Sequence, residues 1–162
     1  MRDLGSELGL LGSSLYSHVS GKGELLVEVV SQGAALFQDL VDEVLRSDAT
    51  PAEQLRTLVK GHVSIVADNL DVARTILNEA KFLPDQERLA IVAMRDRYEA
   101  GVRTVIEGGI ESGDFAVRDA GLATILVLSI VNAFERWYRP DGDRPPQELA
   151  VDMYDFVMKG LT

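Results

Sequence analysis

Apolar residues recur with the spacing of an amphipathic helix along almost the whole chain, and the alternation typical of β-strands is nearly absent. In the first segment, Leu4 and Leu8 lie four residues apart and Gly9 marks an end. A second short helix is predicted from Ser13, and a long one runs from about Lys22 to Arg46. The pattern therefore predicts an all-α protein.

Local signals place the ends of the later helices. The run Thr50-Pro51-Ala52-Glu53 combines a capping box with a proline at the first helical position. Pro84 and Gly113 are helix breakers. After the helix that starts at Pro51, further helices are predicted over about 71–83, 85–112, 119–139 and 147–160. The chain should thus hold about eight helices and no internal repeat.

Composition agrees with one helical domain that has a real core. Hydrophobic residues make up 46% of the 162 residues, and there is no cysteine, which excludes disulfides and thiolate zinc sites and fits a cytoplasmic protein. Arg2, Asp3 and Glu7 interrupt any apolar run at the start, so we expect no signal peptide. The longest apolar stretch, Gly121–Phe134, is shorter than the roughly 20 residues that span a bilayer, which predicts a buried helix and no membrane partner.

Charge is distributed unevenly along the chain. The formal net charge is −10, yet in residues 1–22 Arg2 and Lys22 balance Asp3 and Glu7, so the whole excess belongs to residues 23–162. A neutral segment over residues 1–22 is compatible with nucleic-acid binding there. The acidic charge of residues 23–162 disfavours nucleic-acid binding by the rest of the chain.

No catalytic or metal-binding pattern is recognisable in the sequence. A P-loop, a dinucleotide fingerprint and an H-E-x-x-H motif are all missing. The two histidines, His18 and His62, are far apart and have no second ligand at metal spacing. We therefore expect a protein that is not an enzyme and that uses neither a metal nor a cofactor.

The first residues have the pattern of a helix-turn-helix unit. Gly9 allows a sharp exit from the first helix, and the leucines of both short helices can pack them together. Such a unit offers the start of its second helix to DNA, where Ser13, Ser14 and Tyr16 can donate hydrogen bonds and Lys22 can contact a phosphate. Ordinary packing of two short helices is the alternative interpretation of the same pattern.

The amino-acid sequence of this segment resembles the DNA-binding module of the TetR family of transcriptional repressors. The matching positions are Met1-Arg2-Asp3-Leu4, then Leu15-Tyr16-Ser17-His18-Val19, then Lys22. The resemblance implies that Tyr16 contacts the DNA backbone. It implies for His18 either a phosphate contact or packing against the connecting helix. The DNA-binding residues expected from this segment are Ser13, Ser14, Tyr16, His18 and Lys22.

The same module in the family differs from this chain at three points. The family has a further helix before the one that begins here at Met1, so the resemblance implies an N-terminally truncated module. The turn contains Leu10-Leu11-Gly12 where the family usually has a small polar residue, and Val19 replaces an aromatic one. We therefore expect two parts, a partial helix-turn-helix module over residues 1–21 with its first helix missing, and a helical effector-binding and dimerisation domain over 22–162.

Two later sequence segments resemble those of a branch of the family whose members regulate fatty-acid and steroid breakdown. They are GIESGDF, residues 109–115, and RWYRPDG, residues 136–142. Several members of that branch respond to acyl-CoA thioesters, so the resemblance implies a small hydrophobic effector, with acyl-CoA as one class. His62 is either a core histidine or a polar group in the ligand cavity. The expected ligand-binding residues are His62, Asn78, Phe82, Tyr98 and Trp137.

The run from Leu122 to Trp137 is apolar nearly all round, which predicts burial on two sides, against the chain's own core and against a second subunit. The expected dimer-interface residues are Leu122, Leu126, Ile130, Phe134, Met153 and Val157. The sequence thus predicts a homodimeric, ligand-responsive repressor that binds operator DNA. The alternative is a helical ligand-binding or scaffold dimer that does not bind DNA in this form.

Overall fold

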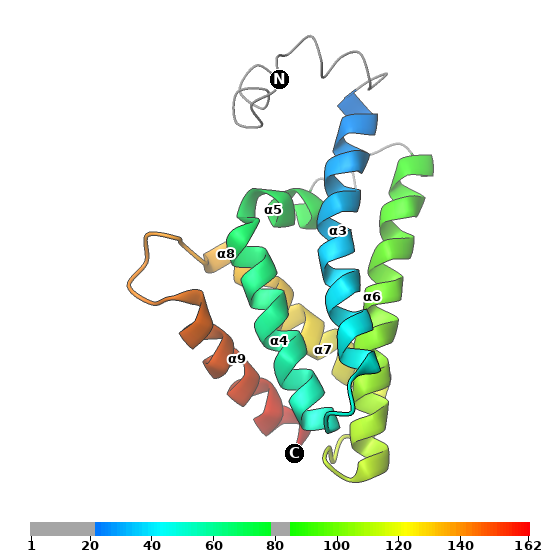
Figure 1. The fold of residues 1–162 in the computed structure, drawn as a ribbon, viewed down its shortest axis with the longest axis vertical. Coiled ribbons are helices and arrows are strands. Elements are labelled where there is room, and N and C mark those ends of the chain that lie inside the picture. The colour runs from blue at the N-terminus through cyan, green and yellow to red at the C-terminus, as the bar shows by residue number, and fades with distance from the viewer. Residues whose placement is uncertain (1–21, 79–84) are drawn as a thin grey trace.

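The computed structural model describes residues 22–78 and 85–162, and within these ranges it is helical with no strand (Figure 1). The helices are α3 (Lys22–Arg46), α4 (Pro51–Asp68), α5 (Leu70–Asn78), α6 (Asp85–Ser112), α7 (Ala120–Asn132), α8 (Phe134–Trp137) and α9 (Pro146–Leu161). The predicted all-α class is confirmed. The two short helices expected before Lys22 lie outside the described residues.

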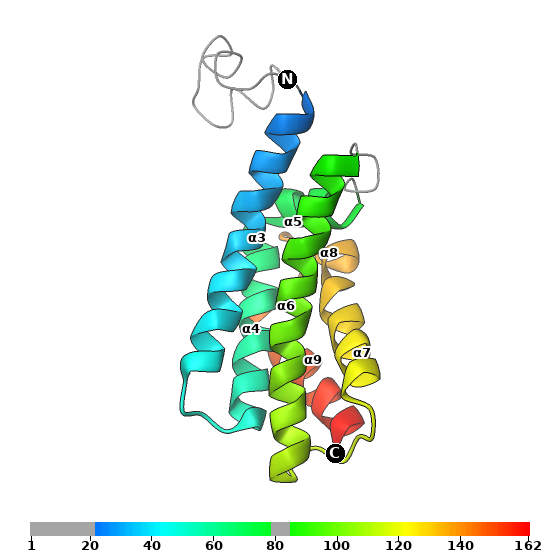
Figure 2. The same cartoon turned by 90° about the vertical axis from the view of Figure 1, so that its right-hand side faces the viewer.

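The two long helices, α3 and α6, lie side by side along one side of the bundle (Figures 1 and 2). α3, α6 and α9 run in one direction along the bundle, and α4 and α7 run in the other (Figure 1). α4 lies between α3 and α9, so its buried residues hold both sides together. The largest fully buried side chains include Leu55, Ile106 and Phe134, which come from α4, α6 and α8.

Glycines permit the closest helix crossings. Gly101 of α6 faces Val41 of α3, where a Cβ atom would overlap Cγ2 of the valine. Gly61 of α4 faces Leu40 of α3 in the same way. Because Val41 is fully buried, the first of these contacts fixes the distance between the two long helices.

Several helix ends lie where local signals predict them. α3 and α6 have the predicted bounds. At the start of α4 the backbone N–H of Thr50 donates to Glu53 Oε2 at 2.9 Å, and the N–H of Glu53 donates to Thr50 Oγ1 at 3.4 Å, which confirms the capping box. Gly113 ends α6 with φ of 85°, a conformation that favours glycine.

The predicted single helix over 119–139 is wrong. α7 ends at Asn132, Ala133 forms a turn, and α8 covers only Phe134–Trp137. Tertiary contacts account for the break: the rings of Phe134 and Tyr138 stack with centroids 4.6 Å apart, and the backbone O of Glu135 accepts from Arg74 Nε on α5 at 3.3 Å. The helix expected over 71–83 is described only as far as Asn78.

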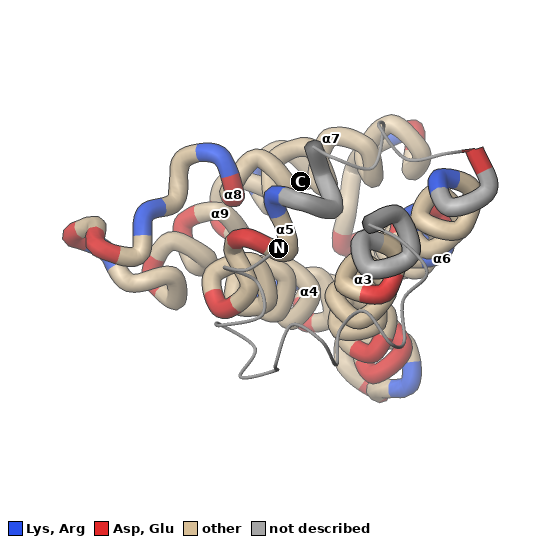
Figure 3. Tube along the Cα trace, turned by 90° about the horizontal axis from the view of Figure 1, so that it is seen from above, with Lys and Arg blue, Asp and Glu red and all other residues tan. Residues whose placement is uncertain are grey.

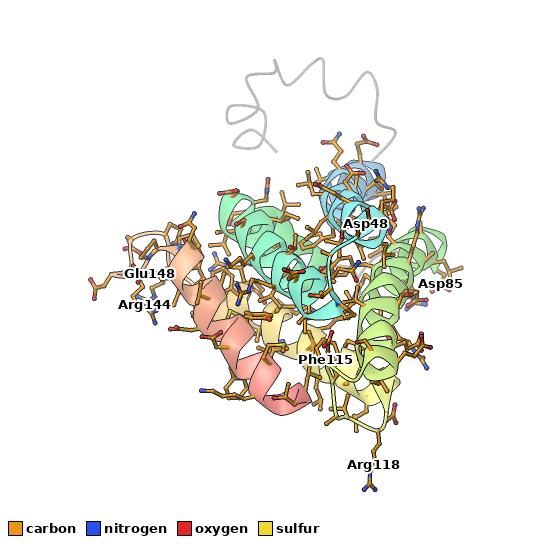
Figure 4. The ribbon with its side chains drawn as sticks, turned by 60° about the horizontal axis from the view of Figure 1, so that its bottom comes forward. Asp48, Asp85, Phe115, Arg118, Arg144 and Glu148 are labelled. Carbon is orange, nitrogen blue, oxygen red and sulfur yellow. The ribbon has the colours of Figure 1, made fainter. Side chains whose placement is uncertain are left out.

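Loops and the C-terminal end are held by specific contacts. The side chain of Phe115 points into the bundle and is buried, whereas Arg118 projects into solvent (Figure 4). The N–H of Ala116 donates to the backbone O of Leu161 at 2.7 Å, which joins the loop after α6 to the end of α9. Arg144 lies beside Glu148 at the start of α9, with Nε and Oε2 3.6 Å apart (Figure 4).

Candidate functional site

A cavity of about 250 Å³ lies inside the bundle among α3, α4, α5, α6 and α7. Its wall is mainly apolar, with a few polar groups, as is typical of small-molecule sites. The lining residues are Ala34, Phe37, His62, Val66, Ala73, Met94, Arg95, Tyr98, Glu99, Ile125, Leu128, Ser129 and Asn132.

His62 and Tyr98 form a hydrogen-bonded pair in the wall of this cavity. His62 Nδ1 lies 3.1 Å from Tyr98 Oη, which joins α4 to α6. The ring of Phe37 from α3 packs on both, with centroids 4.8 Å from His62 and 5.5 Å from Tyr98. Three helices therefore hold the histidine ring in one orientation.

The other ring nitrogen of His62 is unpaired. Nε2 is buried and has no hydrogen-bond partner among the described residues. Burial lowers the pKa of His62 from 6.5 to about 3, so the ring is neutral at physiological pH. Burial also raises the pKa of the Tyr98 hydroxyl, which stays protonated. The cavity thus offers a neutral hydrogen-bonding group in an apolar wall.

The cavity opens to the surface between α6 and α7. Its exposed lining residues are Arg95 and Glu99 on α6 and Ile125 and Ser129 on α7. The mouth therefore carries both charges and an apolar side chain.

Two of the predicted ligand-binding residues, His62 and Tyr98, line the cavity together. Trp137 does not: it is 49% exposed on α8, and its ring lies edge-on to Phe134 with centroids 5.0 Å apart. The break at Ala133 accounts for this, because α8 takes the tryptophan away from the cavity wall. The side chain of Asn78 and the whole of Phe82 lie outside the described residues.

The predicted DNA-binding residues come from the first 22 positions of the chain. Ser13, Ser14, Tyr16 and His18 lie outside the described residues. Lys22 is the first residue of α3, and its side chain is likewise not described. Their contacts with DNA stay predictions.

The six predicted interface residues fall into two groups. Leu122 and Leu126 of α7 are 54% and 55% exposed, and Ile130 is half-buried, so these can meet a partner. The other three are buried in the chain's own core, on α8 and α9, which corrects their assignment to a dimer interface: Phe134, Met153 and Val157. An apolar residue buried against its own bundle has the same periodicity as one buried by a subunit.

Most of the residues that line the cavity were not predicted from the sequence. Phe37, Met94, Ile125 and Leu128 follow the ordinary helical pattern, which does not distinguish a cavity wall from a filled core. Ser129 and Asn132 gave a usable signal, because they are polar residues in an otherwise apolar helix.

The charged groups are dispersed over the outer faces of the described helices (Figure 3). One acidic residue, Glu135, is buried, and its carboxylate lies 3.7 Å from Arg74 Nε and 3.6 Å from Arg136 Nε. Among residues 22–78 and 85–162, no group of three or more His, Asp or Glu side chains is placed to hold a metal ion.

Comparison with known proteins identifies the family of the helical domain. Residues 48–161 match the family described as Tetracyclin repressor-like, C-terminal domain. The HTH-type transcriptional repressor KstR2 of Mycobacterium tuberculosis is 27% identical over 168 aligned positions, which cover 100% of this chain and 82% of the relative.

Solved structures show the same fold. The TetR family regulator PfmR from Thermus thermophilus has a TM-score of 0.88 and 33% identity, over 99% of this chain and 88% of that one. AibR, solved with isovaleryl coenzyme A and operator DNA, has a TM-score of 0.82 and 22% identity, over 95% and 84% of the two chains. KstR2 and PfmR are both named as regulators of transcription. The chain belongs to the TetR family of transcriptional regulators.

Proposed function

We propose that this TetR-type repressor binds operator DNA as a homodimer in the cytoplasm and releases it when a small hydrophobic effector enters the cavity. The observation that carries the proposal is the cavity itself, an opening of about 250 Å³ with apolar walls and a polar pair of His62 and Tyr98. A cavity of that kind inside a regulatory domain is a default ligand site.

The dimensions of the cavity define which part of an effector enters it. At about 250 Å³ it lies below the roughly 300–1,000 Å³ typical of sites for drug-sized ligands. An acyl group fits such a volume, whereas the rest of a coenzyme A molecule has to remain outside the mouth. Arg95 is the cationic residue among those that line the cavity, and it can pair there with an anionic group of the ligand. AibR, which was solved with isovaleryl coenzyme A, supports acyl-CoA as the class to test.

Effector binding has a direct route to the DNA-binding segment. Ala34 and Phe37 line the cavity from α3, and α3 begins at Lys22, immediately after the predicted module over residues 1–21. A ligand that shifts α3 therefore changes the position of that module. In a homodimer the two modules must meet half-sites about one helical turn of DNA apart, so a shift of either lowers operator affinity.

The test is a gel shift with the promoter of the gene itself, at low salt, with and without added isovaleryl-CoA or octanoyl-CoA. A shifted band that disappears with acyl-CoA, but not with free coenzyme A, supports the proposal. A protein that binds acyl-CoA by calorimetry yet never shifts the DNA would favour the alternative, a ligand-binding dimer without DNA binding. Salt is held fixed throughout, because phosphate contacts weaken steeply as salt rises.

A further inference from the structure

We infer that the effector places an uncharged hydrogen-bond acceptor, the carbonyl oxygen of a thioester, against the Nε2–H group of His62. The inference deepens the proposed function and rests on it, because it names the group by which the cavity recognises its ligand. It is carried by the His62–Tyr98 pair and by the unpaired nitrogen beside it.

The contact with Tyr98 determines which ring nitrogen carries the proton. His62 Nδ1 and Tyr98 Oη are 3.1 Å apart, so one of them donates to the other. A phenol hydroxyl is a good donor and a weak acceptor, whereas the unprotonated nitrogen of imidazole is a strong acceptor. We therefore assign the Tyr98 hydroxyl as donor to Nδ1. The proton of the neutral ring then resides on Nε2, which becomes a donor.

This donor has no acceptor within the described residues. His62 is 3% exposed, and Nε2 is the buried side-chain atom without a hydrogen-bond partner there. Leaving a buried donor unpaired costs free energy that a suitable ligand atom restores. A ligand whose acceptor atom pairs with this donor recovers that free energy. This adds to the free energy gained by burying the apolar part of the ligand.

The surroundings select an uncharged acceptor. Burial keeps the ring neutral, with its pKa lowered to about 3, so no positive charge is present to balance a carboxylate. Desolvating an anion in an apolar wall is costly unless it is paired, whereas a carbonyl loses much less hydration. The charged lining residues, Arg95 and Glu99, are exposed on α6 at the mouth. A free fatty acid is therefore a poorer ligand than its thioester.

Contact between a ligand and Nε2 requires a local rearrangement of the cavity wall. Nε2 has almost no surface open to water, so a neighbouring side chain must move when the ligand enters. Met94 lines the same cavity, and its unbranched chain adapts readily to a new shape. The histidine itself is held by Phe37 and Tyr98 and stays in place.

The decisive experiment compares each acyl-CoA with its thioether analogue, in which a CH₂ replaces the carbonyl. Calorimetry at neutral pH measures the binding of isovaleryl-CoA, octanoyl-CoA, the two thioethers and octanoate. The wild-type protein should bind each thioester about 5- to 100-fold more tightly than its thioether, the range expected when a buried donor loses its acceptor. Octanoate should bind more weakly than octanoyl-CoA.

Two variants test whether the difference in affinity between thioester and thioether depends on the His62–Tyr98 pair. His62→Phe should bind thioester and thioether equally, and Tyr98→Phe, which frees the choice of tautomer, should reduce the difference. Thr104→Ala, on the exposed face of α6, is the matched control and should keep it. Circular dichroism shows whether each variant is folded, and the wild-type comparison stands if one is not.

The outcomes separate the inference from the proposed function. Thioester and thioether that bind wild type equally well overturn the inference and leave an acyl-CoA-responsive regulator in place. Octanoate that binds as tightly as octanoyl-CoA overturns the requirement for an uncharged acceptor. If no CoA derivative binds wild type, the acyl-CoA effector is wrong, and the inference is wrong with it.

Discussion

The charge of His62 contributes to the pH dependence of stability. Its pKa is about 3 in the folded protein and near the usual 6.5 when unfolded, so between these values only the unfolded chain takes up the proton. Stability is therefore full above pH 6.5 and falls as the pH drops toward 3. The ionisable residues around His62 are Tyr98, which contacts the ring, and Arg95 and Glu99, which lie at the mouth of the cavity.

We predict that wild type loses about 2 kcal/mol more stability than His62→Gln when the pH falls from 7 to 5. Urea unfolding at the two pH values, with protein concentration fixed, measures this difference. The two proteins are identical at every other position, so their comparison isolates the contribution of residue 62. Parallel pH profiles for the two proteins would show that His62 is not buried and neutral in the folded state.

Gly101 determines how closely α3 and α6 approach. A Cβ there would overlap Val41, whose side chain is buried and, being β-branched, is restricted in χ1. We predict that Gly101→Ala lowers the free energy of unfolding by about 1–3 kcal/mol, the usual cost of overpacking. Gly160→Ala is the control: a Cβ there meets nothing within 4 Å, so stability should stay equal or rise. Thermal unfolding distinguishes them, and equal losses would contradict the argument.

At the scale of whole elements, the start of α4 depends on one side chain. Thr50 Oγ1 accepts from the N–H of Glu53 and donates to its carboxylate at 2.9 Å. We predict that Thr50→Ala destabilises the protein by about 1 kcal/mol, as at other N-caps. Thr104→Ala should cost nothing, because that hydroxyl only returns to the backbone O of Ala100 within an exposed turn of α6. Urea midpoints of the two variants test the pair, and equal midpoints would show that the cap is dispensable.

Helix ends of this kind could be predicted because their signals are local. Thr50, Gly113 and Pro146 act on the backbone within a few residues, and all three stand at the observed ends. The break at Ala133 could not be predicted, since no proline or glycine is there and the cause is contact with α5. His62 was identified as a candidate because it is a polar residue in an apolar stripe. Its partners on other helices depend on the packing, which periodicity does not contain.

At the scale of the molecule, α7 takes part in two features. Its inner face, with Ala123, Val127 and Val131, packs on the core. Its outer face carries Leu122, Ile125 and Leu126, each more than half exposed. The stretch Ala120–Trp137 is long and apolar enough to cross a bilayer by length and composition alone, and a third of it is buried. Because it is two helices broken at Ala133 and packed on the bundle, a second subunit is the better cover for its outer face.

The outer face of α7 also borders the cavity, since Ile125 lines its mouth. A partner subunit seated on Leu122 and Leu126 would therefore lie next to the entrance used by the effector. We predict that wild type is a dimer and that Leu126→Glu is a folded monomer, because a charge in an apolar interface is costly whereas on an open surface it is not. Leu89→Glu, at a residue of α6 that is 66% exposed, is the matched control and should remain a dimer.

Sedimentation velocity at micromolar protein measures the two masses, and circular dichroism verifies that both variants are folded. A dimeric Leu126→Glu would place the interface elsewhere. The monomer, if obtained, also tests the coupling between subunits and operator. Two modules on one DNA bind with an effective concentration that separate chains lack, so Leu126→Glu should lose the gel shift although its residues 1–21 are unchanged. Retention of the shift by a monomer would mean that one module suffices.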